Sequence, residues 1–244
     1  MKQTLNLGLV ASGSGTDANS IMEAYCRQVL LPEVKLCCLL STKPNAGCLD
    51  KAAAHGIMAE TIVRHGLIVG ALRERAKTQF DFEAEVKEWI ARYCLDMIFL
   101  VGCIHTVPIN NRGVSGRPVA MFNIHPARTF EHGGLGMYGL PVHEHVLSEI
   151  VDRLRRHHAR LTDTFYTEPT VHRVIDGYDW GDALMSVKVP IPVDIIEEAQ
   201  TDLTHAAERL QQVVLPFEWL MLPPAVNMAA RLYLDNREPS AMIG

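Results

Sequence analysis

Residues 5–17 read Leu-Asn-Leu-Gly-Leu-Val-Ala-Ser-Gly-Ser-Gly-Thr-Asp, and this stretch predicts how the chain folds. The first seven residues are mostly apolar, which indicates a buried strand, and a helical pattern follows from about residue 18 to residue 29. The glycine-rich turn between them lies at a helix N-terminus, where free N–H groups and the helix dipole favour an anion. The turn lacks the Gly-Lys-Ser/Thr ending of a P-loop, and Ala18 replaces the third glycine of a dinucleotide-binding motif. Alone, it is weak evidence of function.

Strands and helices alternate along the rest of the chain in the order that builds a parallel sheet. Further strands are predicted at residues 34–40, 59–63, 96–101, 119–124, 170–175 and 183–189. Helices are predicted at 47–55 and 82–93, from residue 142 onward, and at 197–220 with an interruption at Pro216. We therefore expect a doubly wound α/β fold, with a mostly parallel sheet and helices on both faces. No repeat, low-complexity segment or linker marks a boundary, so we expect one domain over residues 1–244, with a C-terminal helix and tail from about residue 197.

The composition argues against nucleic acids and membranes as partners. The net charge of −5 offers no electrostatic footprint for nucleic acid, and no apolar run approaches the ~20 residues of a membrane span. The N-terminus enters a strand directly and lacks a signal-peptide pattern, and the six cysteines include no Cys-x-x-Cys pair. We therefore expect a cytoplasmic protein with reduced thiols, acting on small molecules as a monomer or homodimer.

A second stretch, Met-Phe-Asn-Ile-His-Pro at residues 121–126, indicates the chemistry. Side chains alternate across a strand, so Asn123 and His125 face the same side, at the strand end where open α/β sheets bind ligands. An amide that donates to a developing oxyanion beside an imidazole that moves a proton is suited to acyl transfer. The competing interpretation is that Asn123 makes a turn and His125 is a core histidine.

These two stretches, with a third near Asp179, resemble the glycinamide ribonucleotide formyltransferase (phosphoribosylglycinamide formyltransferase) family. The resemblance runs over most of residues 5–220 and rests on residues 11–16, 40–46, 96–102, 123–126, 134–139, 170–179 and 188–190. An Asn-x-His-Pro motif with a downstream Val-His…Asp segment is specific to folate-dependent formyltransferases and their relatives. It is much less specific about the amine that receives the formyl group.

The resemblance implies a role for each matching residue. Asn123 would stabilise the formyl oxygen, His125 would transfer protons, and Asp179 would be the catalytic aspartate. Asp176, three residues earlier, is the other candidate for that aspartate. A carboxylate near an imidazole favours the protonated ring and fixes its orientation. The competing interpretation is that both acids belong to an ordinary turn. The acceptor's phosphate would bind at Ser12, Gly13, Ser14, Gly15 and Thr16, and the folate at Ile104, His105, Val107, Asp176, Gly177 and Tyr178. The co-substrate would be 10-formyltetrahydrofolate.

Departures from the family pattern fall in both substrate sub-sites. Trp180 and Asp182 follow the aspartate where the family usually has a small residue and Pro, and His105 replaces an Arg of many members. Gln211 falls about where the family has an acid that holds the ribose hydroxyls. We predict formyl transfer from 10-formyltetrahydrofolate to glycinamide ribonucleotide in de novo purine synthesis. The alternatives are a formyltransferase acting on another amine, a formyltetrahydrofolate hydrolase, and a catalytically silent folate- or nucleotide-binding homologue.

An insertion at about residues 148–168 is longer than the family's usual connection. Three apolar residues among arginines and histidines suit a helix with a narrow apolar face and a basic outer face: Ile150, Leu154 and Leu161. We expect a lid or subunit contact near the folate side, with a solvated insertion of no role as the alternative.

His143 and His145 could suggest a metal site, but residues i and i+2 of a helix point apart. The family's active site uses no metal either. We therefore expect no metal.

Overall fold

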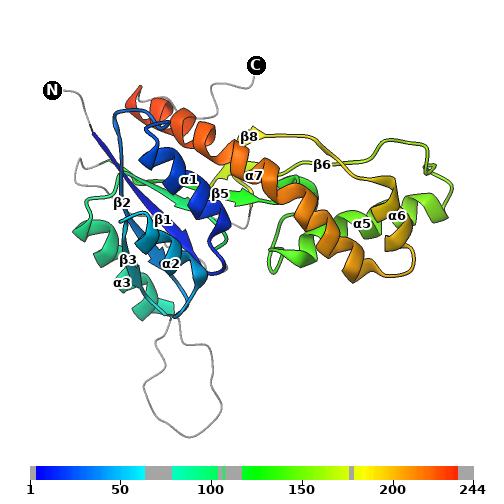
Figure 1. Ribbon diagram of the computed structural model, residues 1–244, viewed down its shortest axis with the longest axis horizontal. Helices are drawn as coiled ribbons and strands as arrows, with labels where there is room; N and C mark the ends of the chain where they lie inside the picture. The colour runs from blue at the N-terminus through cyan, green and yellow to red at the C-terminus, as the bar shows by residue number, and fades with distance from the viewer. Residues whose placement is uncertain (1–3, 64–78, 104–106, 108–116, 176–178, 236–244) are drawn as a thin grey trace, which may run out of the picture. The chain divides into compact units, whose positions relative to one another are not determined.

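The computed structural model describes residues 4–63, 79–103, 107, 117–175 and 179–235 (Figure 1). The chain divides into two compact units, Met1–Phe122 with Val226–Glu238, and Asn123–Ala225 with Pro239–Gly244. The expectation of a single domain stays a prediction. The elements in chain order are β1 (Leu5–Ala11), α1 (Thr16–Cys26), β2 (Val34–Ser41), α2 (Gly47–Ala54), β3 (Met58–Thr61), α3 (Gln79–Arg92), β4 (Met97–Leu100), β5 (Ala120–His125), α4 (Thr129–His132), α5 (Leu140–Arg155), β6 (Tyr166–Thr167), β7 (Thr170–Arg173), β8 (Ala183–Ser186), β9 (Val189–Pro190), α6 (Val193–Ala199) and α7 (Leu203–Leu234).

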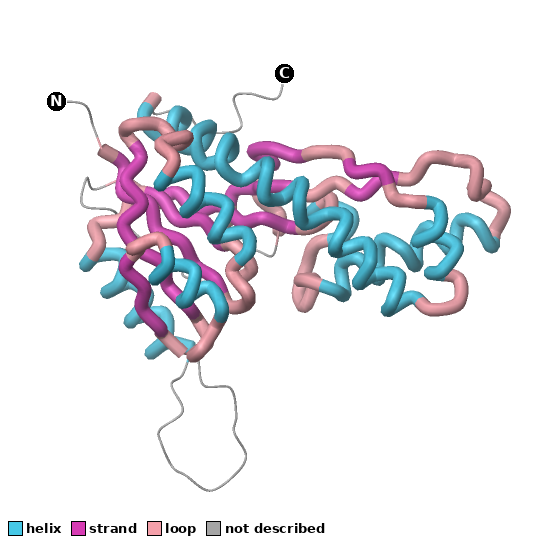
Figure 2. Tube along the Cα trace, in the orientation of Figure 1, coloured by secondary structure: helices cyan, strands magenta, loops and turns pink. Residues whose placement is uncertain are grey.

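Seven strands form one sheet in the order β3-β2-β1-β4-β5-β7-β8 (Figure 2). The pairs β1–β2, β1–β4 and β2–β3 are parallel, and β7–β8 is antiparallel. A two-stranded sheet pairs β6 with β9. The predicted class, an α/β fold with a mostly parallel sheet, is confirmed.

In the first unit, the central strands are buried on both faces. All four residues of β4 are buried, as are six of the seven residues of β1. Figure 1 shows α1 and α2 on one face of these strands and α3 on the other. Gly8 permits a close approach, since a Cβ there would lie 2.8 Å from the Trp89 ring and 2.6 Å from Leu95. Cover on both faces explains why the strands read as continuous apolar runs.

The second unit has an apolar core of its own. It is built by α5, α6 and the first part of α7, which contribute Val142, Leu147, Ile195 and Leu210 to one buried cluster. Each of these four side chains is at most 1% exposed. The core fixes α5, which lies beside the candidate site described below.

Residues 148–168, all of them described, form no helix of their own, so that expectation was wrong. The segment begins inside α5, because Ile150 and Val151 continue the buried face of that helix. Beyond Arg155 the chain passes through turns before β6. Leu161 packs against the core of the second unit, and Arg153 lies over the Phe165 ring at 5.7 Å. The role as a lid stays a prediction.

The expected interruption at Pro216 was also wrong. The predicted helix at 197–220 is two helices, and the second, α7, continues through Pro216, Pro223 and Pro224. A proline inside a helix removes a hydrogen bond and clashes with the preceding turn, at a cost of about 3 kcal/mol. Burial on both sides of Pro216 offsets that cost, since Val214 is 1% and Leu222 0% exposed.

Among the described residues, α7 is the one helix long and apolar enough to cross a membrane by length and composition alone. Its most apolar window is 44% buried inside the structure. Ala206 and Leu210 are buried in the second unit, and Val226 and Ala229 are buried in the first. A core helix has this pattern, so the length of α7 carries no argument for a membrane.

Candidate active site

Asn123 and His125 lie at the end of β5, and the structure brings both side chains to Asp179. The Asn123 amide donates from Nδ2 to Oδ1 of Asp179 at 3.5 Å. The Nδ1 atom of His125 lies 3.8 Å from Oδ2 of the same carboxylate. Residues two apart on a strand share a side, which is why β5 presents the amide and the imidazole together. All three predicted catalytic residues thus lie in one cluster, within the second unit.

The backbone around Asp179 holds its carboxylate in place. Asp179 has a φ of 55°, in the left-handed region that aspartate tolerates better than most residues. The N–H of Gly134 donates to Oδ2 at 3.1 Å. Gly133 gives the carboxylate its space, because a Cβ there would lie 2.8 Å from the Asp179 Cβ and 2.4 Å from the Thr129 carbonyl oxygen.

His172 on β7 is a fourth member of the cluster, to which the sequence analysis gave no role. It is 2% exposed, and its Nδ1 donates to the Arg173 carbonyl at 3.1 Å. Its Nε2 lies 3.3 Å from Oδ1 of Asp179 and 3.3 Å from Nδ2 of Asn123. The signal in the sequence was the Val-His…Asp segment of the family resemblance, in which His172 precedes the aspartate by seven residues.

The Asp179 carboxylate is ionised at neutral pH. Burial alone would raise its pKa, but the close contact with His172 and the charge of His125 act in the opposite sense. The Gly134 N–H adds to them, and the net effect holds the pKa below its ordinary value of 3.8. The cluster therefore contains a fixed negative charge beside two imidazoles.

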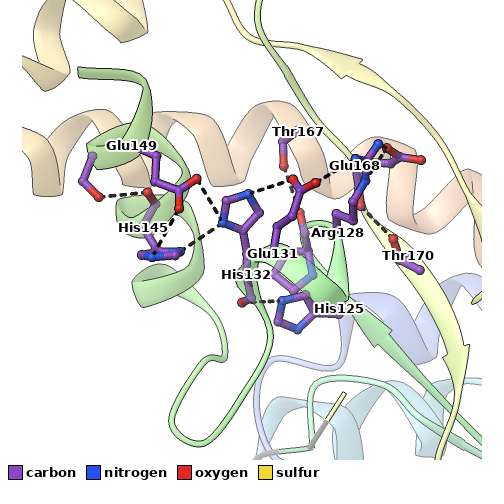
Figure 3. A network of polar contacts seen from close by, with 11 residues as sticks. His125, Arg128, Glu131, His132, His145, Glu149, Thr167, Glu168 and Thr170 are labelled. Atoms are coloured by element: carbon purple, nitrogen blue, oxygen red, sulfur yellow. Dashed lines mark hydrogen bonds and ion pairs between the residues drawn. The ribbon is translucent and has the colours of Figure 1, made fainter. Parts of the chain in front are cut away.

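His125 is a buried imidazole with one nitrogen committed to the backbone. Its Nε2 donates to the His132 carbonyl at 3.1 Å, since a carbonyl can only accept (Figure 3). In the neutral ring the Nδ1 atom facing Asp179 is then the acceptor. Burial lowers the pKa of His125, and the charge of Asp179 partly opposes this. The ring is therefore a base at Nδ1 that becomes the cation of an ion pair on taking up a proton.

His143 on α5 borders the same environment and stays neutral. It is 1% exposed, and burial, with a smaller effect of His125, lowers its pKa to about 4. Within the described residues its Nδ1 has no hydrogen-bond partner. His145, two residues on, is half-exposed, whereas His143 is buried, so the two rings do point apart as expected.

Together these groups can support acyl transfer. Asn123 has two hydrogens on Nδ2 and can direct one at an oxyanion. His125 can take a proton at Nδ1 and return it, while Asp179 balances the resulting charge. The arrangement fits a reaction in which an amine attacks a carbonyl carbon and a proton moves between two nitrogens.

In the first unit, the glycine-rich turn leaves backbone exposed at a helix N-terminus, where an anion could approach it. Gly13 and Ser14 are exposed at the N-terminus of α1, ahead of Gly15 and Thr16. Gly15 has a φ of 74°, and a Cβ there would lie 2.5 Å from the Cys48 Cα. The N–H of Ser12 already donates to the Gly102 carbonyl at 3.0 Å. Ser12 is thus part of the support of the turn.

Most of the predicted folate-binding residues lie outside the described residues: Ile104, His105, Asp176, Gly177 and Tyr178. Val107 is described, and its side chain is buried, at 3% exposed. Trp180, beside Asp179 in sequence, is 68% exposed.

Comparisons with known proteins agree on one family. Residues 6–216 match the family model described as formyl transferase. The chloroplastic phosphoribosylglycinamide formyltransferase of Arabidopsis thaliana is 26% identical over 205 residues, which cover 84% of this chain and 62% of that protein. The phosphoribosylglycinamide formyltransferase of Schizosaccharomyces pombe is 26% identical over 208 residues, covering 84% of this chain and 92% of that protein. The chain therefore spans less than two thirds of the plant relative's length.

Solved structures share the fold. Glycinamide ribonucleotide transformylase 1 from Symbiobacterium toebii has a TM-score of 0.66 at 22% identity, over 97% of this chain and 91% of that chain. The enzyme of the same name from Geobacillus kaustophilus has a TM-score of 0.63 at 20% identity, over 93% and 99%. At these identities the likeness shows the fold alone.

Proposed function

Because residues 6–216 match its model, the chain belongs to the formyl transferase family, and we propose that it transfers a formyl group from 10-formyltetrahydrofolate to the amine of glycinamide ribonucleotide. The observation that carries this proposal is the cluster of Asn123, His125 and Asp179. The names of the relatives support the choice of acceptor. The reaction would be a step of de novo purine synthesis.

In the proposed reaction, the amine lone pair attacks the formyl carbon, and the carbonyl electrons move to oxygen. Asn123 donates an N–H to that oxyanion as the charge develops. The Nδ1 atom of His125 takes the proton lost by the attacking amine and becomes an imidazolium beside Asp179. The proton then passes to N10 of the folate as the bond from N10 to the formyl carbon breaks. No metal takes part directly in this step, and that expectation stays a prediction.

The exposed turn at Gly13 and Ser14 would bind the acceptor's phosphate. Their N–H groups lie at the N-terminus of α1, a helix of 11 residues whose dipole favours negative charge there. Gly15 and Thr16 complete the turn. The location in the cytoplasm and the monomeric or homodimeric state stay predictions.

A related enzyme that formylates another small amine is the main alternative. It is favoured by Gln211, which replaces the acid expected to hold the ribose, and it would keep the same three catalytic residues. A hydrolase would use water as the acceptor, and a silent homologue would bind its ligands without turnover.

A direct assay of formyl transfer decides among these. We expect the wild type to formylate glycinamide ribonucleotide, and Asn123→Ala to lose roughly 10²–10³-fold in kcat, because one oxyanion donor is removed. His125→Ala should lose at least as much, since it removes the base. His205→Ala deletes an exposed imidazole of the same unit and should keep full activity.

The outcomes separate the candidates. Formate release without formylation of the amine would point to a hydrolase, and transfer only to other amines would point to the related enzyme. Near-wild-type transfer by folded Asn123→Ala and His125→Ala would show that the roles are misassigned.

A further inference from the structure

A second polar cluster in the same unit has no part in the proposed reaction. It consists of His132 at the end of α4, and His145 and Glu149 on α5 (Figure 3). The Nδ1 atoms of the two imidazoles lie 3.0 Å apart. Oε2 of Glu149 lies 3.9 Å from Nδ1 of His132, and Oε1 lies 3.8 Å from Nε2 of His145. One ligand atom from each residue lies within 4.8 Å of the others.

These distances are compatible with a metal ion as well as with a hydrogen bond between the two rings. Two neutral imidazoles 3.0 Å apart at Nδ1 can share one N–H···N hydrogen bond, whereas an ion would accept the lone pairs of both nitrogens. Zinc binds histidine nitrogen at about 2.0–2.1 Å, which at a tetrahedral angle separates two such nitrogens by roughly 3.3 Å. The carboxylate needs only a rotamer change to reach the same point, because His145 and Glu149 are four residues apart on one helix face.

His132 has the supporting contacts that metal-binding histidines usually have. Its side chain is 9% exposed, and Oε2 of Glu131 lies 3.9 Å from its Nε2, on the side away from the cluster. A carboxylate on that side favours the tautomer with its proton on Nε2, which leaves the lone pair of Nδ1 for an ion. Glu131 is itself held, because Arg128 donates to its Oε1 at 2.8 Å.

The cluster borders a cavity that leaves room for a further ligand. His132 and Glu149 line a pocket of about 290 Å³, with Arg153, Phe165 and Glu168 among its other walls. An ion held by two imidazoles and one carboxylate would thus keep an open position toward the pocket, which water can fill.

We propose that His132, His145 and Glu149 bind one divalent ion of the zinc class, with water at the open position. Two imidazoles and a carboxylate favour zinc and its neighbours over magnesium or calcium, which prefer oxygen ligands alone. The ion would tie α4 to α5. The His132 carbonyl accepts a hydrogen bond from Nε2 of His125. An ion that fixes His132 would therefore also position the catalytic imidazole.

Metal titration of the chelator-treated full-length chain tests the site directly. We expect one equivalent of Zn²⁺ by calorimetry, and one of Co²⁺ with visible d–d absorption of a low-symmetry site containing nitrogen ligands. At a hundredfold excess over Kd the melting temperature should rise by roughly 5–10 °C. The same concentration of Mg²⁺ should leave the melting temperature unchanged.

Two variants and one control assign the ligands. His145→Ala and Glu149→Gln change half-exposed side chains, and each should weaken Zn²⁺ binding at least tenfold and remove the Co²⁺ bands. His205→Ala is the control, since it removes an exposed imidazole that also faces a glutamate, Glu198, and it should bind as the wild type does. If the wild type binds no stoichiometric Zn²⁺, or if His145→Ala binds it unchanged, the proposal is overturned and the imidazoles share a proton instead.

Activity then tests the positioning role and leaves the binding result intact. We expect removal of the ion to lower kcat by about tenfold with little change in KM, because His125 loses its fixed partner while the substrate sites are untouched. An unchanged kcat in the stripped enzyme would overturn the positioning role. A chain that binds zinc but transfers no formyl group to any amine would refute the proposed function alone.

Discussion

Asp179 links the other side chains of the candidate active site, because Asn123, His125 and His172 all lie within 3.8 Å of its carboxylate. These contacts hold its pKa below 3.8 in the folded chain, so the ionised form contributes stability at neutral pH. That contribution is present above about pH 4 and is lost as the pH falls through the folded-state pKa.

Replacing the carboxylate should therefore remove a pH-dependent part of the stability. We expect the free energy of unfolding of the wild type to exceed that of Asp179→Asn by a constant amount from pH 7 to about pH 5, and the difference to shrink below pH 4. Urea unfolding at several pH values measures it, with Asp152→Asn on the exposed face of α5 as the control. A difference that is still undiminished at pH 3 would contradict the role of the ionised carboxylate.

Individual site residues differ in how far the sequence could place them. Strand alternation was enough to put Asn123 and His125 on one side. Asp179 is 54 residues beyond His125 (179 − 125 = 54), so a family resemblance was needed to join them. His172 lies in the Val-His…Asp segment of the family resemblance, but it received no role, because its contacts depend on how β7 and the left-handed turn at Asp179 come together. His132 and His145 likewise meet only through the packing of α4 on α5.

At the scale of elements, α7 retains prolines that its own propensity opposes. Pro216 is exposed, so it contributes no buried surface that would be lost on substitution. We expect Pro216→Ala to raise the free energy of unfolding by about 1–3 kcal/mol. Alanine restores the backbone N–H that donates within the helix and removes the clash of the proline ring with the preceding turn. The melting temperature should rise by roughly 2–4 °C per kcal/mol.

The control for this substitution is Pro32→Ala. Pro32 is exposed in the turn before β2, where its ring restricts the unfolded chain, and its loss should cost less than about 1 kcal/mol. A fall in melting temperature for Pro216→Ala would show that the proline is favourable where it stands.

The elements that the sequence predicted well are those with one dominant signal. The strands β2, β4 and β5 begin and end within one residue of their predicted bounds, because continuous apolar runs bounded by turn residues admit few alternatives. The errors lie where tertiary packing decides. α7 passes through Pro216 because both flanks are buried, and the 148–168 segment begins inside α5 because its apolar residues continue the face of that helix.

At the scale of the whole molecule, the division into two units leaves no mark in the sequence. The boundary falls between Phe122 and Asn123, inside β5, and again between Ala225 and Val226, inside α7. Neither place has the Pro/Gly-rich or polar composition of a linker, so the sequence predicted a single domain. Because a strand and a helix both run through the boundary, each unit taken alone would contain two broken elements.

We therefore expect the chain to unfold in one cooperative transition despite its two cores. Leu7→Ala in the first unit and Leu210→Ala in the second each remove a fully buried side chain, at a cost of about 2–5 kcal/mol. In scanning calorimetry both variants should lower the temperature of the same single transition, with the calorimetric and van't Hoff enthalpies equal. Two resolved transitions, each displaced by only one of the variants, would instead identify the units as separate domains. Both substitutions replace a buried leucine by alanine and so create the same kind of cavity, each in a different core. A difference between the two variants would therefore report on the units and not on the type of substitution.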